Sequence, residues 1–296
     1  MIEILEKGFL TLPVSSARHH LERYGVPRTG PLDVCRYTLA NRLVDNPDGA
    51  WALEATMAVP AIFFHEAHSF AVVGGECGLF LEREGRRIPV PAGRAAEARA
   101  GDRLTGGPLQ SGFRAYLAVA GGIEGASCVP LSAGDRLTVG QTEGGRLRTV
   151  LEEPLSMPGR NAVLRVVEGV HAGQFSPEGL AAFYGGPYAY TPQSDRMGVR
   201  FAGEPVGFAP GRDGNIISEG TLPGDIQVPA SGQPLLMLEA CQTVGGYAKI
   251  AHVIAADLPM AAQLVPGAQV RFRLVSVPEA QAAWRRLWYK MSCCID

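Results

Sequence analysis

The chain has 296 residues, of which 46% are hydrophobic and 19% are charged, and its formal net charge is -2. This length suits one large or two medium globular domains. The near-neutral charge excludes a broad basic surface, so nucleic acid is not an expected partner. No stretch comes near the roughly 20 apolar residues that span a bilayer, so we expect a soluble protein without a membrane partner.

The six cysteines are scattered, form no C-x-x-C pair, and have no zinc-ligand spacing with the histidines. No metal site is therefore predicted. The acidic first residues contain too short an apolar run for a signal peptide. We expect a cytoplasmic protein whose cysteines stay as thiols.

The first half of the chain opens with a strand-like segment over residues 2–14, which a helix follows. Asp33 complements the start of the helix dipole, apolar residues repeat at helical spacing over 32–43, and Asn46 and Pro47 end the pattern. Beyond the helix, short apolar runs alternate with glycine, proline or charge, which is typical of a barrel or a sandwich.

The second half follows a polar, turn-rich segment over residues 143–161, where we place a domain boundary. It begins with a strand over 163–167 and a short helix that Ser176 caps and Pro177 begins. Further strands run to 270–274. Each half thus contains a strand, an early helix and a set of short strands, which suggests two related barrels.

A final helix is predicted from the capping-box pattern between Ser276 and Glu279. The expected fold is therefore mainly β with a few short helices. We assign residues 1–150 to an N-terminal β-barrel domain, 160–275 to a C-terminal β-barrel domain, and 276–296 to a C-terminal helix and tail.

The most informative segments lie in the second half, at residues 218–229, 232–234 and 242–247. They place turn formers and uncharged polar groups between short apolar strands. A purely structural hairpin rarely needs so many polar groups. We interpret the segments as a strand-loop-strand-loop unit that directs main-chain N–H groups and amide side chains at a small ligand.

Residues 242–249 are interpreted as a glycine turn with a cation at its end. Gly245 and Gly246 allow the main chain to approach a ligand closely, and successive N–H groups form an anion-binding concavity. Lys249 could add a point charge for a phosphate or carboxylate. The structural alternative is a tight hairpin with a solvated Lys249. No P-loop motif occurs in the chain.

Glu219 and Gln227 flank a Pro-Gly turn. Glu219 could act as a general base, and Gln227 could hydrogen-bond a lactam or ureido group through both its donor and its acceptor. The structural alternative for each is a hydrogen bond that stabilises the turn.

Other polar residues have alternative explanations. Asp195 and Arg196 could form an ion pair that fixes their loop. Glu54 lies in an apolar segment, where a carboxylate needs a partner; Arg28 or Arg42 could pair with it or bind a substrate carboxylate.

Three further residues are expected to be structural. His171 and His252 are lone histidines, and Cys241 has no neighbouring histidine that would activate it for covalent catalysis.

Several motifs together resemble the allophanate hydrolase subunit 2 family, also called the biotin-dependent carboxyltransferase family. They run in the family's order along nearly the whole chain. The matching segments are YGVP at 24–27, GPLD at 30–33, ANRLV at 40–44, NP at 46–47, ALE at 52–54, RAYLAVAGG at 114–122, SDRMG at 194–198, SEG at 218–220, IQVP at 226–229, QT at 242–243, GGY at 245–247, AAQ at 261–263 and PG at 266–267.

The resemblance implies two cyclophilin-like β-barrel domains and association with a subunit 1 partner. In the 5-oxoprolinase members, the C subunit acts with a further lactam-hydrolase subunit, and the complex uses ATP to open 5-oxoproline to glutamate. ATP is thus the implied cofactor, shared with the partner subunits. In fused urea carboxylases the related unit transfers a carboxyl group from biotin to urea, and biotin is implied only under that alternative.

The chain departs from the family pattern in several places, and the clearest is a missing loop. Family members usually carry a Gly-Ser-Arg-Ser-Thr-like loop after the Ala-Gly-Gly strand, and residues 122–137 lack it. This departure favours, as the second hypothesis, a non-catalytic regulatory or binding subunit like the Kip-type antagonist of a kinase inhibitor.

The primary hypothesis is a subunit of an ATP-dependent amide or lactam hydrolase, most similar to the C subunit of 5-oxoprolinase. Its expected catalytic residues are Glu219, Asp195 and Lys249. Its expected substrate-binding residues are Gln227, Gln242, Thr243, Gly245, Gly246, Tyr247, Arg196 and Glu54.

Overall fold

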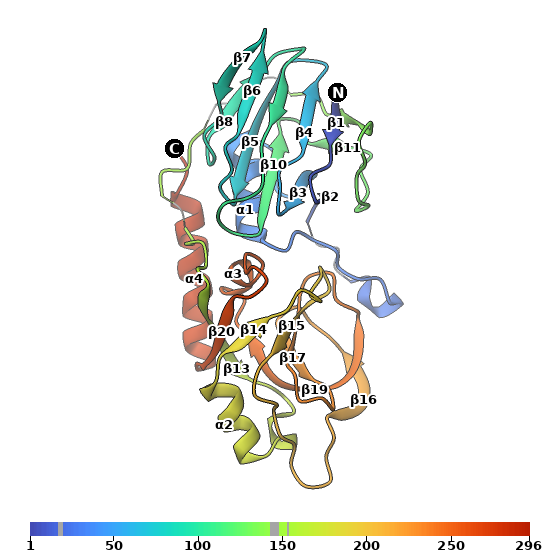
Figure 1. Ribbon diagram of the computed structural model, residues 1–296, viewed down its shortest axis with the longest axis vertical. Coiled ribbons are helices and arrows are strands. Elements are labelled where there is room, and N and C mark those ends of the chain that lie inside the picture. The colour runs from blue at the N-terminus through green and yellow to red at the C-terminus, as the bar shows by residue number, and fades with distance from the viewer. Residues whose placement is uncertain (17–19, 143–147, 153) are drawn as a thin grey trace. The chain divides into compact units, whose positions relative to one another are not determined.

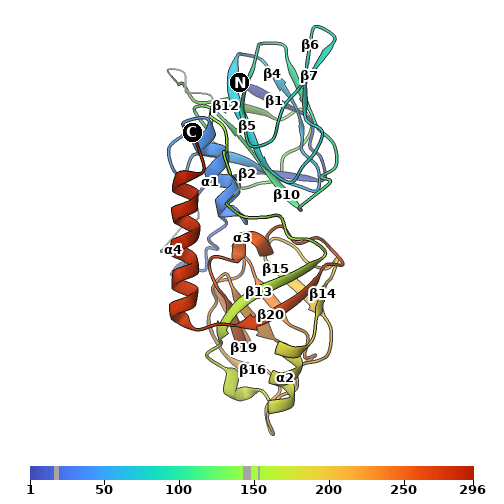
Figure 2. The same cartoon turned by 90° about the vertical axis from the view of Figure 1, so that its left-hand side faces the viewer.

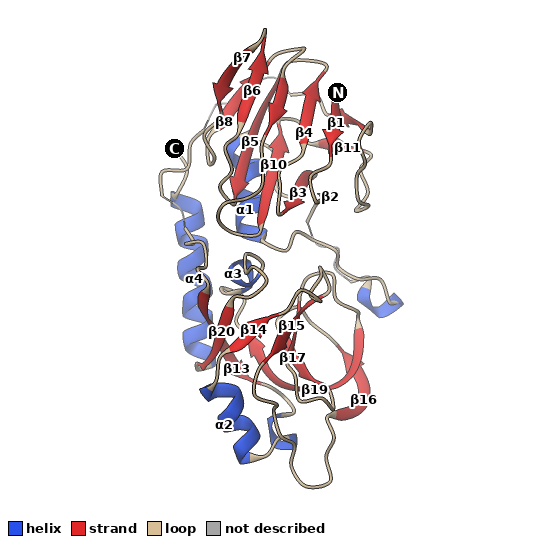
Figure 3. Cartoon of the chain, viewed as in Figure 1, coloured by secondary structure: helices blue, strands red, loops and turns tan. Residues whose placement is uncertain are grey.

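The computed structural model describes residues 1–16, 20–142, 148–152 and 154–296, and within them strands dominate over four short α-helices (Figure 3). This confirms the predicted mainly β fold. No helix in the described ranges is long and apolar enough to cross a membrane.

The chain divides into two compact units. The first comprises Met1–Ser16, Asp33–Met157 and Tyr289–Asp296, and the second comprises Ala17–Leu32 and Pro158–Trp288. Each unit is therefore built from segments that lie apart in the sequence, whereas the sequence predicted continuous domains. The domain limits 1–150, 160–275 and 276–296 stay a prediction, because compactness does not show which segment folds by itself.

The first unit contains two sheets around one core (Figure 1). The seven-stranded sheet has the order β11-β12-β1-β4-β9-β6-β7 and the five-stranded sheet the order β2-β3-β10-β5-β8. The strands are β1 (Ile2–Glu6), β2 (Leu10–Val14), β3 (Ala52–Thr56), β4 (Ala61–Phe64), β5 (His68–Gly74), β6 (Phe80–Arg83), β7 (Arg86–Pro89), β8 (Ala95–Ala98), β9 (Arg103–Thr105), β10 (Arg114–Val119), β11 (Ile123–Glu124) and β12 (Arg136–Val139).

The predicted strand over residues 2–14 is two strands, β1 and β2, which belong to different sheets. Between them Gly8 has a φ of 65°, and a Cβ there would lie 2.7 Å from the carbonyl oxygen of Ala58. Only glycine fits this left-handed, close-packed position, so the chain can turn from one sheet to the other there.

The second unit is a closed barrel. Its strands pair in the order β13-β20-β14-β15-β18-β17-β19, pairing of β13 with β19 closes the ring, and β16 is added to β19 (Figures 1 and 2). The strands are β13 (Asn161–Glu168), β14 (Tyr188–Tyr190), β15 (Gly198–Ala202), β16 (Asn215–Gly220), β17 (Asp225–Val228), β18 (Leu235–Met237), β19 (Val244–Val253) and β20 (Gln269–Leu274).

The helices begin where the sequence predicted. The side chain of Asp33 caps α1 (Val34–Leu43) by accepting from the N–H of Arg36, and Ser176 caps α2 (Pro177–Gly185) in the same way. Ser276 and Glu279 form the expected reciprocal capping box before α4 (Val277–Cys293). The sequence did not predict three short helical segments. These are α3 (Leu258–Ala261) and the 3-10 helices Glu22–Tyr24 and Ala172–Gln174.

Side chains along each barrel strand point alternately into the hydrophobic core and to the outer surface. Ile226 and Val228 of β17 belong to the hydrophobic core, so Asp225 and Gln227 on the same strand face outward. The predicted polar residues of the second half therefore lie on the outside of the barrel.

An aromatic cluster inside the barrel provides a test of this fold. Phe272 is 2% exposed, and its ring stacks on Phe183 with 4.7 Å between centroids. Replacing Phe272 by alanine removes these contacts and leaves a cavity, so we expect the free energy of unfolding to fall by about 3–5 kcal/mol in urea denaturation. The matched control is Leu274→Ala on the same strand, where the side chain is 50% exposed and the expected change is about 0.5 kcal/mol. Equal losses in both variants would contradict this packing.

Candidate functional site

A pocket of about 250 Å³ lies on the second unit, at strands β15, β17, β18 and β19 and the loops beside them. Its wall combines apolar side chains with charged and amide groups. The lining residues are Asp195, Met197, Gly198, Val199, Arg200, Gln227, Pro229, Leu235, Met237, Gln242 and Tyr247. Four of the predicted site residues (Asp195, Gln227, Gln242 and Tyr247) are thus brought together.

Strand register explains how the polar residues come to one face. Leu235 of β18 pairs with Arg200 of β15 on one side and with Gln227 of β17 on the other. Gln227 in turn pairs with Lys249 of β19. These four residues form a row across four neighbouring strands.

The Gln227 side chain is the best-defined polar feature of the pocket wall. The residue is 1% exposed, and neither Nε2 nor Oε1 has a hydrogen-bond partner among the described residues. A buried amide without partners costs about 1–3 kcal/mol per group, so such groups are normally satisfied by a ligand or by water.

Gly245 makes room for this amide. A Cβ at Gly245 would lie 2.6 Å from Nε2 of Gln227 and 2.9 Å from Oγ1 of Thr221. The same addition at Gly246 would meet nothing closer than 3.4 Å, at Oγ of Ser218. The two adjacent glycines therefore have different roles, and only Gly245 is required by close approach.

The predicted glycine turn over residues 242–249 is wrong. Residues Val244–Val253 form one continuous strand, β19, in which Gly245 pairs with Glu219 of β16. Turn propensity was overridden by pairing with β16, β17 and β13. The N–H groups of this segment belong to a strand instead of an anion-binding turn.

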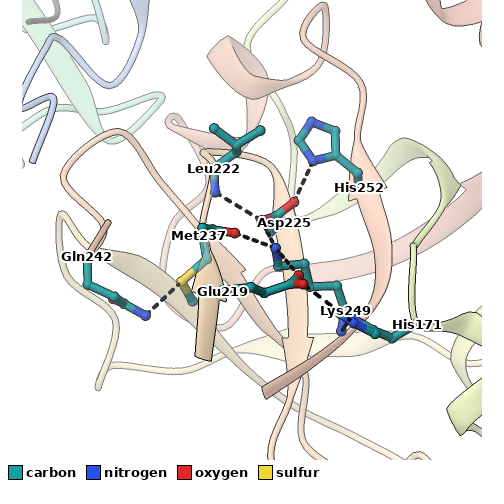
Figure 4. A network of polar contacts seen from close by, with 9 residues as sticks. His171, Glu219, Leu222, Asp225, Met237, Gln242, Lys249 and His252 are labelled. Carbon is teal, nitrogen blue, oxygen red and sulfur yellow. Dashed lines mark hydrogen bonds and ion pairs between the residues drawn. The ribbon is translucent and has the colours of Figure 1, made fainter. Parts of the chain in front are cut away.

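Lys249 lies at the centre of a polar network (Figure 4). Its ammonium group is 2.7 Å from Oε1 of Glu219, 3.3 Å from Oδ2 of Asp225 and 2.6 Å from the carbonyl oxygen of Gly220. Each of its three donors thus has a partner within the chain. Lys249 orients Glu219 in this arrangement and would have to release a partner to bind a substrate anion.

Both histidines that were expected to be structural contact this network. Nδ1 of His252 is 2.9 Å from Oδ1 of Asp225. Nδ1 of His171 accepts from the N–H of Lys249, and its Nε2 is 3.8 Å from Oε2 of Glu219. Asp225 was given no role from the sequence, although its position two residues before Gln227 places both side chains on one face of a strand.

In this network, burial and polar contacts act in opposite directions on the pKa values of Lys249 and Asp225. Burial alone would lower the pKa of Lys249, but the hydrogen bond to Glu219 and the charge of Asp225 raise it above its ordinary value. Burial would raise the pKa of Asp225, but hydrogen bonds from His252 and from the N–H of Leu222, with the charge of Lys249, hold it below its ordinary value. The lysine is therefore an ammonium and the aspartate a carboxylate near neutral pH.

The remaining predicted residues of the second unit have local partners. Oδ1 of Asp195 accepts from the N–H groups of Met197 and Gly198. Nε2 of Gln242 lies 3.7 Å from Sδ of Met237, and the carbonyl oxygen of Thr243 accepts from the N–H of Thr221.

Burial shifts the pKa values of Arg196 and Cys241. Arg196 donates to the carbonyl oxygen of Gly30, and burial lowers its pKa to about 10, against the effect of Glu239. Burial raises the pKa of the Cys241 thiol to about 11, which leaves it a poor nucleophile near neutral pH.

Glu54 belongs to the first compact unit, apart from the network just described. It is 0% exposed, Tyr116 donates to its Oε2 at 2.7 Å, and Nε of Arg114 is 3.8 Å from its Oε1. Its partners differ from the predicted ones, because Arg28 pairs with Glu239 and Arg42 donates to the carbonyl oxygen of Met291. These contacts hold the carboxylate in that core, and a role of Glu54 in substrate binding stays a prediction.

A search for metal ligands covered all the described residues. The described residues contain no group of three or more His, Cys, Asp or Glu side chains that could hold a metal ion.

Comparison with known proteins supports the family resemblance. The family described as carboxyltransferase domain, subdomain A and B, matches residues 24–274. The C subunit of 5-oxoprolinase from Escherichia coli K12 is 32% identical, over 96% of this chain and 94% of that protein. The same subunit from Haemophilus influenzae is 28% identical, over 97% of this chain and 95% of that protein.

A solved structure extends the comparison to the fold. The crystal structure of the K. lactis urea amidolyase superposes with a TM-score of 0.86 and 26% identity, over 99% of this chain and 20% of that chain. This chain thus corresponds to about a fifth of the urea amidolyase. The matched region and the nearly full-length similarity to the bacterial proteins show that the chain belongs to the family of carboxyltransferase domains with subdomains A and B.

Proposed function

We propose that this chain is the C subunit of an ATP-dependent 5-oxoprolinase, which opens the lactam ring of 5-oxoproline to give glutamate. The proposal is supported by similarity to the Escherichia coli protein along nearly the whole chain. The observation that carries it is the Gln227 amide, which is buried at a pocket wall without a partner among the described residues.

The chemistry of Gln227 suits a cyclic amide. A primary carboxamide presents an N–H donor and a C=O acceptor on one edge. A lactam ring forces its amide to be cis, so that its own N–H and C=O also lie on one edge. An open-chain secondary amide is almost always trans and presents the two groups on opposite sides. Gln227 can therefore form two parallel hydrogen bonds with a lactam but only one with a peptide.

The other groups receive supporting roles. Gln242 and Tyr247 border the ligand, with Met237 and Leu235 as the apolar wall beneath the ring. Glu219, oriented by Lys249, would accept the proton of an attacking water molecule. Lys249 is a positioning residue in this scheme, because its ammonium contacts Glu219 and Asp225 rather than open space.

The pocket, with a volume of about 250 Å³, suits a small cyclic amide better than a nucleotide. The three partners of Lys249 also leave it without a free donor for a phosphate. We therefore propose that the partner subunits, subunit 1 and a lactam hydrolase, hold the nucleotide. The same proposal places the complex in the cytoplasm, where thiols such as the six free cysteines stay reduced.

Carboxyl transfer is the second candidate function. A ureido group presents the same cis N–H and C=O edge as a lactam, so Gln227 would also hold the ring of biotin or a urea molecule. The similarity to the K. lactis urea amidolyase favours this candidate. This chain corresponds to about a fifth of that protein, and carboxyl transfer would also need a biotin carrier.

The first prediction separates the candidates. The chain is purified together with the partner subunits that co-purify with it, and glutamate release from 5-oxoproline is measured with and without ATP. We expect ATP-dependent release that requires this chain. An assembled complex without turnover would reject the proposal and favour a regulatory subunit, and ATP-dependent carboxylation of urea would favour the second candidate.

The two glycines of β19 test the role of Gln227. Gly245→Ala places a methyl group 2.6 Å from Nε2 of Gln227 and should displace the amide. We expect KM for 5-oxoproline to rise by about tenfold or more, which corresponds to a loss of at least about 1.4 kcal/mol of binding free energy. Gly246→Ala is the matched control, since its Cβ meets only an ordinary contact at 3.4 Å. Unchanged KM in both variants would remove Gln227 from substrate binding.

The polar network should affect stability in a pH-dependent way. The pKa of Asp225 is lowered in the folded protein, so its contribution to stability is present above the ordinary aspartate pKa of about 4 and is lost as the pH falls through the folded pKa. We expect Asp225→Asn to lower the unfolding free energy by about 1.5–3 kcal/mol at neutral pH, and the difference from the wild type to shrink at acidic pH. Urea denaturation between pH 3 and 7 measures it, with the exposed Glu204→Gln as control. A difference that is constant over this range would contradict the network.

A further inference from the structure

We propose that Arg200 recognises a carboxylate on the ligand of this pocket, so that the site selects a small cyclic amide that also carries a carboxylate. This inference deepens the proposed function and rests on it for the identity of the amide. No sequence motif pointed to Arg200; from the sequence, Arg28 and Arg42 were the candidates for a substrate carboxylate.

The position of Arg200 follows from the barrel. In β15, Val199 and Phe201 face the core, so Arg200 between them faces outward. Leu235 separates Arg200 from Gln227 in the row across β15, β18 and β17, and all three residues line the pocket. With about 4.8 Å between neighbouring strands, the backbones of Arg200 and Gln227 are about 10 Å apart. A five-membered ring and its carboxylate fit between two side chains at this separation.

The charge of Arg200 is available for a ligand. Its main chain is hydrogen-bonded to Ser194 and Thr191, but its guanidinium group has no hydrogen bond or ion pair within the described residues. In contrast, the guanidinium groups of Arg28 and Arg165 pair with Glu239 and Asp257. A guanidinium group binds a carboxylate through two parallel N–H bonds, which gives direction as well as affinity.

The arrangement separates two classes of ligand. A neutral urea or lactam can use only the Gln227 amide, whereas a lactam carboxylate can use both Gln227 and Arg200. Arg200 is the only cation among the described residues that line the pocket, so it is the group there that attracts a carboxylate. Arg200 therefore favours 5-oxoproline-like ligands over urea-like ligands.

The test compares two probes that share one ring. Binding of 5-oxoproline and of 2-pyrrolidinone, which lacks the carboxylate, is measured on the full chain by ligand-observed NMR titration. We expect the wild type to prefer 5-oxoproline by about 10- to 100-fold, as for a charge-assisted pair of hydrogen bonds. Arg200→Met should reduce this preference to about twofold or less and leave 2-pyrrolidinone binding unchanged. Arg200→Lys should retain part of the preference.

Controls separate recognition from a structural role. Arg212→Met removes an exposed arginine of the same unit that does not line the pocket, and it should change neither affinity. If Arg200 has only a structural role, Arg200→Met should lower the free energy of unfolding and leave the preference for 5-oxoproline intact, which would overturn the inference.

The remaining outcomes distinguish this inference from the proposed function. A complex that hydrolyses 5-oxoproline while Arg200→Met keeps the wild-type preference would overturn the role of Arg200 and leave the function standing. Loss of the preference in Arg200→Met, with an inactive wild-type complex, would support the role of Arg200 and reject the function. A wild-type chain that binds neither probe, or both equally, would also overturn the inference.

Discussion

A register shift between β17 and β19 determines which side chains meet on the functional face. Ile226 is opposite Ala251, but the next residue, Gln227, is opposite Lys249. Lys249 and His252 are three residues apart, and in a regular strand they would point to opposite faces. The extra residue in β19 brings both to the outer face, where each contacts Asp225. Without the bulge, one of them would enter the core.

Closure of the barrel makes this face rigid. β19 pairs with β13, β16 and β17, and the apolar side chains of the ring fill its interior. Charged groups on such a support have few ways to relax, so opposite charges must neutralise one another locally. Lys249 between Glu219 and Asp225 meets this requirement. In the same row, the Gln227 amide and the Arg200 guanidinium group have no such partner within the described residues. The Gln227 amide and the Arg200 guanidinium group can therefore form hydrogen bonds with a ligand.

Local chemistry predicted much of the fold. Two of the three longer helices were found from their caps, since Ser176 and Ser276 act on neighbours within three residues. The helix α1 was predicted from its apolar spacing and from the charge of Asp33, which the structure shows to be its cap. The mainly β character and the family also followed from short motifs. Strand partners could not be predicted, because they depend on residues far apart in the chain. For this reason the Gly245–Gly246 pair was predicted as a turn although it belongs to a strand.

The site was predicted in part, for the same reason. Gln227, Gln242 and Tyr247 were identified because polar residues are unusual between apolar strands. Arg200 and Asp225 were missed, since an arginine or aspartate in an alternating strand resembles any solvated residue until its neighbours across the sheet are known. Glu54 was recognised as a buried carboxylate, but its partner Tyr116 is 62 positions away.

The interleaving of the two compact units has a consequence for synthesis on the ribosome. Residues 17–32 are made early but belong with 158–288, and residues 289–296 belong with the first unit although they are made after the whole second unit. The second unit can finish folding once residue 288 is made, whereas the first unit lacks its last segment until residue 296 is made. The strands described for the first unit all precede residue 140, so its sheets can form early. At about 5–20 residues per second, they then wait many seconds for the end of α4 and for the bridge between Val150 and Ile295.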